Sequence, residues 1–496
     1  MTNPITIDAG MASPAASPAE RKPLCVDCDG TLVHTDLFHE SFLLLLKASV
    51  FQALLVPFWL LVHGKAATRL RIAGLVGIDA ATLPYCAEVL DYLRTERARG
   101  RRIVLATASA QSQAEAIAAH LGCVDQVLAT NAADGIDLAG EAKAARLAQA
   151  FGDHGFEYLG NGRDDYPAWR RAGAISLANA SPAVRRTAQG WGAARIVAPA
   201  APPTWRAVLK VMRLHQWMKN LLVLVPLVAA RALGDPALLG AALAAFLAFG
   251  LCASSVYILN DMLDIPADRA HPRKRRRPFA AGTLPLPLGA AAMVALLCGA
   301  VVLAAQLPPA FGATLATYYA LTLAYSFQLK RRVVVDVMLL SMLYTIRILA
   351  GAAATAIVPS FWLLAFSMFL FFSLAIMKRY GEMLDSARTD QRRPSGRGYH
   401  IADAAALLAL GAASGVSAVQ VLALYIHSAE VALMVRTPQL LWVCVPLMLY
   451  WVSRVWIKTH RGEMHDDPVV FAAKDKQSLA IGLVVVAVIS VGDRFF

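Results

Sequence analysis

Hydrophobic and polar positions divide the chain into two parts with different patterns. Between residues 23 and 180, short apolar runs alternate with helical stretches. The runs predict strands, and the stretches between them predict helices. The predicted strands are 23–27, 102–107, 124–129 and 157–160, and the predicted helices include 112–121 and 140–151. Such alternation is typical of an α/β domain with a parallel sheet.

From residue 217 onward, apolar segments long enough to span a bilayer recur. Nine spans are predicted, at 217–233, 238–259, 285–305, 310–328, 334–356, 361–378, 402–425, 439–457 and 477–493. Four alternate loops carry most of the Lys and Arg residues, and the opposite loops are short and nearly neutral. Because basic loops stay on the cytoplasmic side, we expect them and the α/β domain in the cytoplasm and the C-terminus outside.

These patterns imply four regions. Residues 1–22 are rich in Ala, Pro and Ser and lack an apolar core, so we expect a disordered N-terminus without a cleaved signal peptide. Residues 23–192 are expected to form the α/β domain. An Ala- and Pro-rich linker is expected at 193–204, and the transmembrane domain at 205–496.

A further apolar segment, 41–63, lies inside the soluble domain. A single crossing there would separate residues that are expected in one sheet, and Lys47, Gln52 and Pro57 interrupt the segment. We therefore expect an interfacial or re-entrant helical pair that docks the domain on the membrane. A buried helical cap without lipid contact is the alternative.

Composition supports a membrane protein. Of the 496 residues, 57% are hydrophobic and 16% charged, and the mean hydropathy is +0.52, which excludes an ordinary soluble protein. The net charge of +13 is compatible with nucleic acid binding, but in a membrane protein basic cytoplasmic loops are the simpler explanation, and we favour it. We expect membrane lipids as partners and no nucleic acid.

Candidate chemistry concentrates between residues 260 and 278, where the second predicted span ends. Asp261, Asp264 and Asp268 lie three and four residues apart, and six basic residues follow them. Carboxylates this close can share Mg²⁺, which usually bridges to substrate phosphates, and the basic residues can neutralise a polyphosphate. Charged groups at the edge of a bilayer are costly and usually functional, so the stretch predicts a diphosphate site.

The run Cys25-Val-Asp27-Cys-Asp29-Gly30-Thr31-Leu32 resembles the first motif of the haloacid dehalogenase superfamily, which implies a Rossmann-type α/β phosphatase domain. The resemblance implies that Asp27 attacks phosphorus, while Asp29 protonates the leaving oxygen and then activates water. Thr107 would hydrogen-bond the phosphoryl group, and Lys143 would stabilise its charge.

The run Gly160-Asn161-Gly162-Arg163-Asp164-Asp165 resembles the acidic loop of that superfamily, which helps Asp27 and Asp29 to hold Mg²⁺. Asn161 stands where members commonly have Asp, so one anionic ligand is lost and Asp165 or Asp164 would have to compensate. An active phosphatase and a decayed binding module both remain open.

The nine predicted spans, with Asn260, Asp261, Asp264 and Asp268 at the end of the second, resemble the UbiA superfamily of intramembrane prenyltransferases over residues 205–496. The run from Asp268 to Gly282, with His271, Pro272, Lys274, Arg277 and Pro278, looks like its polyprenyl-phosphate (decaprenyl-phosphate) phosphoribosyltransferase branch. Further substrate-binding residues implied by the resemblance are Lys219, Asn220, Tyr325, Lys330, Asp336, Arg347, Lys378 and Arg379.

The resemblance implies phosphoribosyl pyrophosphate as donor and a polyprenyl phosphate as acceptor, in a bacterial inner (plasma) membrane. Mg²⁺ on Asp261, Asp264 and Asp268 would stabilise the leaving pyrophosphate. An arginine deep in an apolar helix is costly, so Arg347 is expected to be functional or paired with Asp336.

Together the two domains suggest a bifunctional enzyme. It would make polyprenyl-phosphoryl-5-phosphoribose and then remove the 5-phosphate, supplying a lipid-linked pentose for cell-envelope glycans. One alternative is a prenyltransferase with a prenyl diphosphate donor and an aromatic acceptor, and another is a transporter or lipid-binding protein. The polyprenyl length and the oligomeric state stay open, and a homo-oligomer is compatible with the sequence.

Overall fold

The computed structural model describes residues 22–200, 205–388, 398–428, 431, 437–464 and 467–494. The chain forms two compact units, of which the first comprises residues 1–207 and 261–286 and the second residues 208–260 and 287–496. The region predicted to be a disordered N-terminus lies outside the described residues, apart from Lys22.

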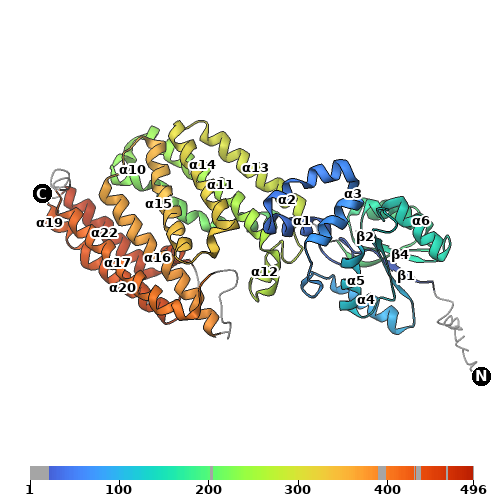
Figure 1. Cartoon of the computed structure of the whole chain (residues 1–496). Helices are drawn as coiled ribbons and strands as arrows, with labels where there is room; N and C mark the ends of the chain where they lie inside the picture. The colour runs from blue at the N-terminus through green and yellow to red at the C-terminus, as the bar shows by residue number, and fades with distance from the viewer. Residues whose placement is uncertain are drawn as a thin grey trace, which may run out of the picture. The chain divides into compact units, whose positions relative to one another are not determined.

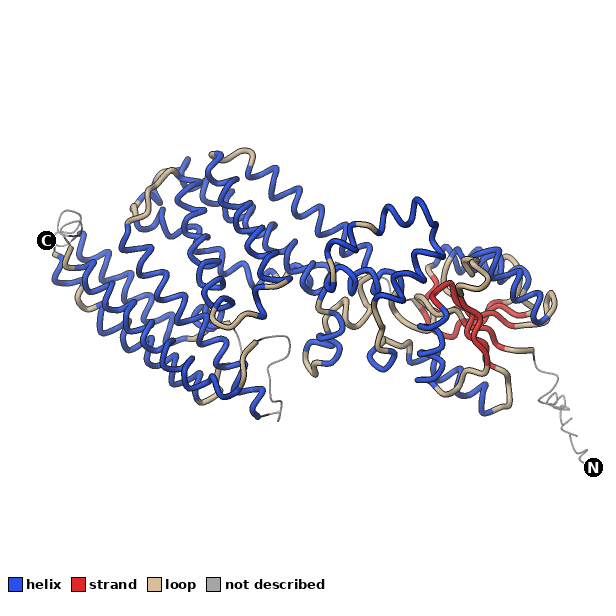
Figure 2. The backbone as a smooth tube through the Cα atoms, in the orientation of Figure 1, coloured by secondary structure: helices blue, strands red, loops and turns tan. Residues whose placement is uncertain are grey.

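Six parallel strands form one sheet in the first unit, in the order β3-β2-β1-β4-β5-β6. Figure 2 shows the strands of this sheet in red with helices on both sides of it. The strands are β1 Leu24–Val26, β2 Ile103–Ala110, β3 Gln126–Thr130, β4 Glu157–Gly160, β5 Ala174–Ala180 and β6 Ala194–Pro199. The four predicted strands are all present, within a few residues of their expected bounds. The predicted α/β domain with a parallel sheet is confirmed.

Both faces of the sheet are buried, which explains why its strands are continuous apolar runs. Leu24 and Val26 pack in a cluster on one face, whereas Cys25 and Val104 belong to a cluster on the other. Helices follow the strands, as right-handed crossovers in a parallel sheet require. They are α4 Ala87–Ala98, α5 Gln111–Leu121, α6 Gly140–Phe151, α7 Tyr166–Arg171 and α8 Pro182–Gln189, with short 3₁₀ turns η2 Ala80–Thr82 and η3 Arg163–Asp165.

The predicted linker at 193–204 needs a correction. Most of its first half is β6, which pairs with β5 at the edge of the sheet. Pro199 ends this strand, and an edge position tolerates proline because no further strand needs its missing N–H. The Ala- and Pro-rich composition therefore concealed an edge strand.

The apolar segment 41–63 forms helices within the first unit (Figure 1). They are α1 Leu37–Ala48, α2 Val50–Leu54 and α3 Val56–Leu75. Leu45 and Trp59 are buried between them, but Phe51, Leu54 and Leu61 are 73%, 72% and 86% exposed. A fully buried cap is therefore wrong, and contact with lipid stays a prediction.

The second unit is helical, and six of its described helices are long and apolar enough to cross a membrane. These six are α11 Pro236–Leu263 (which ends in the first unit), α13 Leu286–Ala304, α15 Val335–Thr355, α16 Phe361–Arg388, α17 Ala404–Ile426 with the preceding turn η8 Ile401–Asp403, and α20 Cys444–His460 with the preceding α19 Pro438–Leu441. Helices α14 Pro309–Phe327 and α22 Lys476–Arg494 occupy two further predicted spans. Nine spans are not confirmed.

The structure differs most clearly from the prediction at the first predicted span, 217–233, which is not one continuous helix. It is broken into η4 Leu214–Leu224, α10 Val225–Ala229 and η5 Ala232–Gly234, preceded by α9 Trp205–Met212. Arg213 and Arg231 have φ values of +52° and +57°, so each starts a new turn in place of continuing a helix. The backbone of η4 lies against Gly351 of α15, where a Cβ would collide with the Val223 carbonyl.

Candidate active sites

The first site lies where the strand order of the sheet reverses, between β1 and β4. Asp27 follows β1 and Asn161 follows β4, so both lie at the carboxyl ends of adjacent parallel strands. Open parallel sheets bind ligands at this switch point because the loops diverge and leave a crevice. Thr107, in the neighbouring β2, is buried and accepts a hydrogen bond from the Ser109 amide at 3.1 Å.

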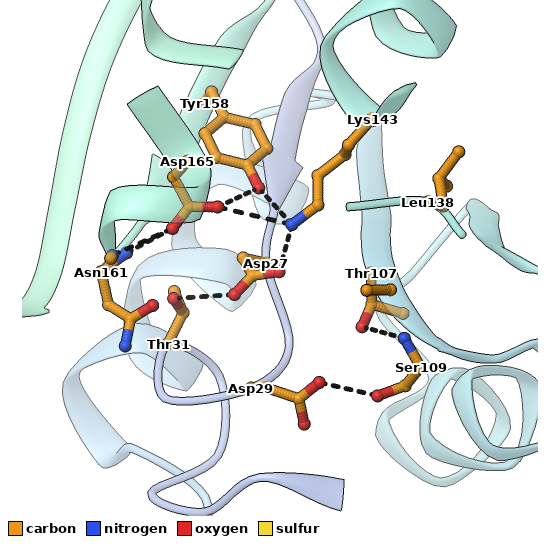
Figure 3. A network of polar contacts seen from close by, with 12 residues as sticks. Asp27, Asp29, Thr31, Thr107, Ser109, Leu138, Lys143, Tyr158, Asn161 and Asp165 are labelled. Atoms are coloured by element: carbon orange, nitrogen blue, oxygen red, sulfur yellow. Dashed lines mark hydrogen bonds and ion pairs between the residues drawn. The ribbon is translucent and has the colours of Figure 1, made fainter. Parts of the chain in front are cut away.

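Lys143 of α6 connects the acidic side chains of this site (Figure 3). Its Nζ donates to Asp27 Oδ1 at 2.7 Å and to the Tyr158 hydroxyl at 2.9 Å, and lies 3.4 Å from Asp165 Oδ1. Burial raises the pKa of Asp27 to about 7, while the Lys143 charge acts in the opposite direction. The lysine thus supplies the positive charge that an anionic nucleophile or phosphoryl group needs here.

Asp165 is fixed by its neighbours. Tyr158 donates to Oδ1 at 2.8 Å, and the backbone amides of Asn161 and Gly162 donate to Oδ2 at 2.9 and 3.1 Å. With Lys143 added, the four acceptor positions of the carboxylate are filled. In this arrangement Asp165 shapes the loop after β4 and orients Lys143.

Asp29 is held by two hydrogen-bond donors, which favour its charged form. The Ser109 hydroxyl donates to Oδ2 at 2.7 Å and the Leu37 amide to Oδ1 at 2.8 Å. Burial raises the pKa of Asp29 to about 6, and the nearby Asp36 acts in the same direction. A carboxyl group with a raised pKa keeps a larger protonated fraction near neutrality, as general acid catalysis requires.

The site contains oxygen ligands of the kind that bind Mg²⁺. It has one carboxylate fewer than is common in the haloacid dehalogenase superfamily, because Asn161 replaces an aspartate. Gly30 has φ +77°, and a Cβ there would collide with the Asn161 side chain, so that amide lies against the Asp27–Asp29 turn. Asp27 and the Asn161 amide oxygen fit such a cation. No group of three His, Cys, Asp or Glu side chains gathers closely enough to hold a metal in the part of the chain that the structure describes.

Asp261, near the end of α11, and Asp264 and Asp268, which follow that helix, also belong to the first unit. Arg277 Nη1 lies 3.1 Å from Asp261 Oδ1 and 2.7 Å from Asp268 Oδ2, so one guanidinium nitrogen holds two carboxylates together. A divalent cation could occupy the same position, since it would satisfy both anions. Asp264 instead lies 3.0 Å from Lys47 Nζ of α1. Asp268 is in α12 Ile265–Ala270.

In the second unit, one carboxylate pairs with two lysines close to a buried arginine. Asp467 accepts from Lys219 Nζ at 2.7 Å, from Lys378 Nζ at 3.1 Å and from the Tyr344 hydroxyl at 2.9 Å. The Tyr344 ring also lies beneath Lys219 and Arg347, at 5.5 and 5.7 Å from the charged atoms. These five residues are called the cation cluster below.

Arg347 is buried and is held by neutral acceptors. Its Nε donates to Asn220 Oδ1 at 3.0 Å, its Nη2 to the Tyr318 hydroxyl at 3.1 Å, and its Nη1 to the Leu343 carbonyl. Within the described ranges, the Asn220 amide nitrogen is buried and has no hydrogen-bond partner.

The suggested pairing of Arg347 with Asp336 is wrong. Asp336 accepts from Arg379 Nε at 2.8 Å and from the Tyr399 hydroxyl, and both charged side chains of the Asp336–Arg379 pair are fully buried. Arg379 also pairs with Glu382. Asp336 and Arg379 therefore form a structural pair between α15 and α16, apart from the contacts of Arg347.

The remaining predicted residues are distributed over both units. Asn260 in α11, Tyr325 in α14 and Lys330 in η7 Leu329–Arg331 are half-buried, and Lys274 is exposed in η6 Lys274–Arg276. Sequence reasoning missed Ser109, Tyr158, Tyr318, Tyr344 and Asp467, which contact predicted residues. Only Asp467-Pro468 carried a local signal, since Asp before Pro often begins a helix, here α21 Pro468–Lys474.

Two protein families match the chain. The UbiA prenyltransferase family matches residues 221–476, and the haloacid dehalogenase-like hydrolases match residues 24–170. An uncharacterised protein of Sinorhizobium fredii is 34% identical over 466 residues, covering 93% of this chain and 89% of that protein. The nodulation protein NoeC of Azorhizobium caulinodans is 37% identical over 283 residues, covering 55% of this chain and 90% of its own.

A third relative matches part of the UbiA region. The decaprenyl-phosphate phosphoribosyltransferase of Mycobacterium tuberculosis is 40% identical over 188 residues, which are 37% of this chain and 62% of that enzyme. The two resemblances expected from the motifs are thereby confirmed at the level of the family. The chain belongs to the UbiA prenyltransferase family and carries a haloacid dehalogenase-like domain at its N-terminal end.

Proposed function

We propose that this integral membrane protein transfers 5-phosphoribose from phosphoribosyl pyrophosphate to a polyprenyl phosphate. Its haloacid dehalogenase-like domain then removes the 5-phosphate, giving polyprenyl-phosphoryl-ribose for envelope glycans. Both sites would face the cytoplasm of a bacterial inner membrane, with nine spans and an external C-terminus. The observation that carries the proposal is the cation cluster, where Lys219 and Lys378 pair with Asp467 and Arg347 lies against the Tyr344 ring without a carboxylate partner among the described residues.

The charge balance of that cluster supports an anionic substrate. The cluster has three cations and one carboxylate, and two of the cations, Lys219 and Arg347, are buried, so the excess of positive charge is expensive without a bound anion. The unpartnered Asn220 amide adds a neutral donor next to Arg347. A diphosphate or a lipid phosphate would satisfy both requirements through charge-assisted hydrogen bonds.

The aspartates at the end of α11 and in the segment that follows it would bind Mg²⁺ and diphosphate. Asp261 and Asp268, with Asp264, would hold Mg²⁺, which when bound neutralises negative charge on a leaving diphosphate. The lipid phosphate oxygen forms a bond to ribose C1 while the bond from C1 to the diphosphate breaks. The attacking oxygen is already anionic, so no strong base is needed. The name of the mycobacterial relative, a decaprenyl-phosphate phosphoribosyltransferase, supports phosphoribosyl transfer to a polyprenyl phosphate.

The product carries a 5-phosphate monoester, the substrate type that the haloacid dehalogenase-like domain would hydrolyse. Asp27 attacks phosphorus, and Asp29 gives its proton to the departing ribose oxygen. Asp29 then takes a proton from water, which hydrolyses the aspartyl phosphate and regenerates Asp27. Lys143 and Thr107 would hold the phosphoryl oxygens. Tethering raises the effective concentration of the lipid product at the second site.

The test supplies the full-length protein in lipid nanodiscs with ribose-labelled phosphoribosyl pyrophosphate and polyprenyl phosphate, and identifies lipid products by mass spectrometry. Asp261→Asn should abolish lipid labelling, and Asp27→Asn should accumulate the 5-phosphorylated lipid. Asp235→Asn and Asp153→Asn, at exposed positions, are the matched controls. No lipid labelling by the wild type would refute the transfer, and unchanged products with Asp27→Asn would refute the phosphatase step. Labelled prenyl diphosphate and an aromatic acceptor test the alternative prenyltransferase.

A further inference from the structure

The segment 261–286, here called the aspartate loop, is part of the same compact unit as the haloacid dehalogenase-like domain. It contains the last residues of α11, then α12 and η6, and it ends where α13 begins. Its chemistry concerns the proposed transferase, yet within the unit it contacts α1, the turn before α1, and η2. The two helices involved, α1 and α12, are labelled in Figure 1.

Two ion pairs join α1 to this loop. Glu40 accepts from Arg269 Nη1 at 2.9 Å and from Nη2 at 2.5 Å, in a bidentate pair whose side chains are each 6% exposed. Arg269 Nε also donates to the Ala280 carbonyl at 3.0 Å, so Arg269 connects α1 to the far part of the loop. A buried bidentate pair fixes both distance and orientation, unlike a surface pair.

The second pair acts at the start of the loop. Lys47 Nζ donates to the Leu263 carbonyl at 3.0 Å and to Asp264 Oδ1 at 3.0 Å. The last carbonyls of a helix have no partner within the helix, and a lysine there satisfies one of them and opposes the negative end of the helix dipole. Lys47 therefore stabilises the end of α11 and orients Asp264.

Packing between the two segments is close. Gly282 has φ +69°, and a Cβ at this position would collide with the backbone of His34, just before α1. Leu43 and Leu44 of α1 share a small cleft with Ile265 and Pro266 of the loop. Ile265, Asp268, Phe279 and Ala280 are buried. The loop thus has a defined shape because the soluble domain packs against it.

We propose that Glu40 and Lys47 are positioning residues of the transferase. By fixing Arg269 and Asp264, α1 of the haloacid dehalogenase-like domain sets the geometry of the aspartate loop, so the transferase depends on its soluble domain even when the phosphatase chemistry is blocked. This inference rests on the proposed function, because it assumes that the aspartate loop binds Mg²⁺ and diphosphate.

The experiment compares wild type, Glu40→Gln, Lys47→Met and the charge swap Glu40→Arg with Arg269→Glu, all in the full chain. Glu96→Gln is the control, because Glu96 is an equally buried acid paired with Arg101 at 3.1 Å in the same domain. Hydrogen exchange is followed in peptides from 261–286, with peptides from β2 reporting whether the domain is folded. Transfer is measured as KM for phosphoribosyl pyrophosphate, half-saturating Mg²⁺ and kcat.

We expect at least tenfold faster exchange in the aspartate loop for Glu40→Gln and Lys47→Met, with β2 unchanged. KM and half-saturating Mg²⁺ should rise at least fivefold while kcat changes less, and the charge swap should recover part of both effects. Glu96→Gln should leave loop exchange and KM unaltered. Loop exchange and KM equal to wild type in both single variants would overturn the inference.

The two proposals fail in different ways. If the proposed function is wrong, the wild type itself shows no lipid labelling, while loop exchange still reports whether α1 orders the loop. If only the positioning role is wrong, the wild type transfers phosphoribose and Glu40→Gln matches it in KM and in Mg²⁺ requirement. Asp27→Asn, which blocks the phosphatase chemistry alone, should leave KM for the transfer unchanged.

Discussion

Replacing Arg347 by Met separates a functional from a structural role for this buried cation. The guanidinium is held by Asn220, Tyr318 and the Leu343 carbonyl, all of them neutral. Across the described residues, no carboxylate lies within ion-pair distance of it. A buried charge without a counterion lowers stability, so its presence favours a role in binding an anion.

Arg347→Met is expected to change stability little and substrate binding much, because opposing terms cancel only in the stability. Arg347→Met leaves the Asn220 oxygen and the Tyr318 hydroxyl with one partner fewer, at about 1–3 kcal/mol for each group left unsatisfied. Removal of the desolvated charge offsets several kcal/mol of this loss. We therefore expect thermal stability within about 2 kcal/mol of wild type. A lost hydrogen bond to a phosphate costs about 1.5–3 kcal/mol, which predicts KM about 10- to 100-fold higher for one substrate.

The assay is transfer of labelled phosphoribose to polyprenyl phosphate, with KM measured for each substrate, beside thermal unfolding in detergent. Arg454→Met is the matched control, because Arg454 pairs with Asp475 at 2.7 and 3.0 Å and contacts no member of the cation cluster among the described residues. We expect the control to lower the melting temperature and keep both KM values. Arg347→Met with both KM values and kcat within twofold of wild type would refute the argument.

Three further results are expected. Tyr158→Phe removes the hydroxyl that orients Lys143 and should lower phosphatase kcat about tenfold. The control Tyr92→Phe should leave kcat unchanged, and equal kcat values for the two variants would exclude this role of Tyr158. Asp467→Asn should lower the melting temperature but strengthen inhibition by pyrophosphate, because two lysines lose their internal anion; weaker inhibition would indicate a metal ligand instead. A fluorescent side chain at Leu61 should be quenched by nitroxide lipids in reconstituted vesicles, and one at Glu115 should not; equal signals would contradict membrane contact.

Local patterns determined much of the fold. Of the four predicted strands, β1, β2 and β4 lie inside the sheet, where burial on both faces gives a continuous apolar run. The interior strand β5 was not predicted, because Ser176 and Asn179 interrupt its apolar run. The edge strand β6 was missed because its residues are partly exposed and its composition is that of a linker. The broken segment at 217–233 was missed because its apolar composition is that of a helix, while left-handed residues such as Arg213 depend on packing.

Side-chain partners depended on the tertiary structure. Asp336 and Arg347 lie eleven residues apart in one helix, about 16 Å along its axis, so a direct pair was excluded by helix geometry. Their actual partners come from other helices. Asp467 meets Lys219 across 248 positions of sequence, and Glu40 meets Arg269 across 229.

By itself, the sequence determined the parallel sheet, the apolar helices and the motifs that begin each site, because periodicity and turn chemistry act over a few residues. Only the tertiary structure decided that Asp165 accepts hydrogen bonds from its own domain and that Asp467 pairs with two lysines. The contacts of α1 with the aspartate loop likewise appear only in the tertiary structure. The reason is physical: which charges meet depends on how elements distant in the chain pack against each other, and burial then selects the pairs that can satisfy one another.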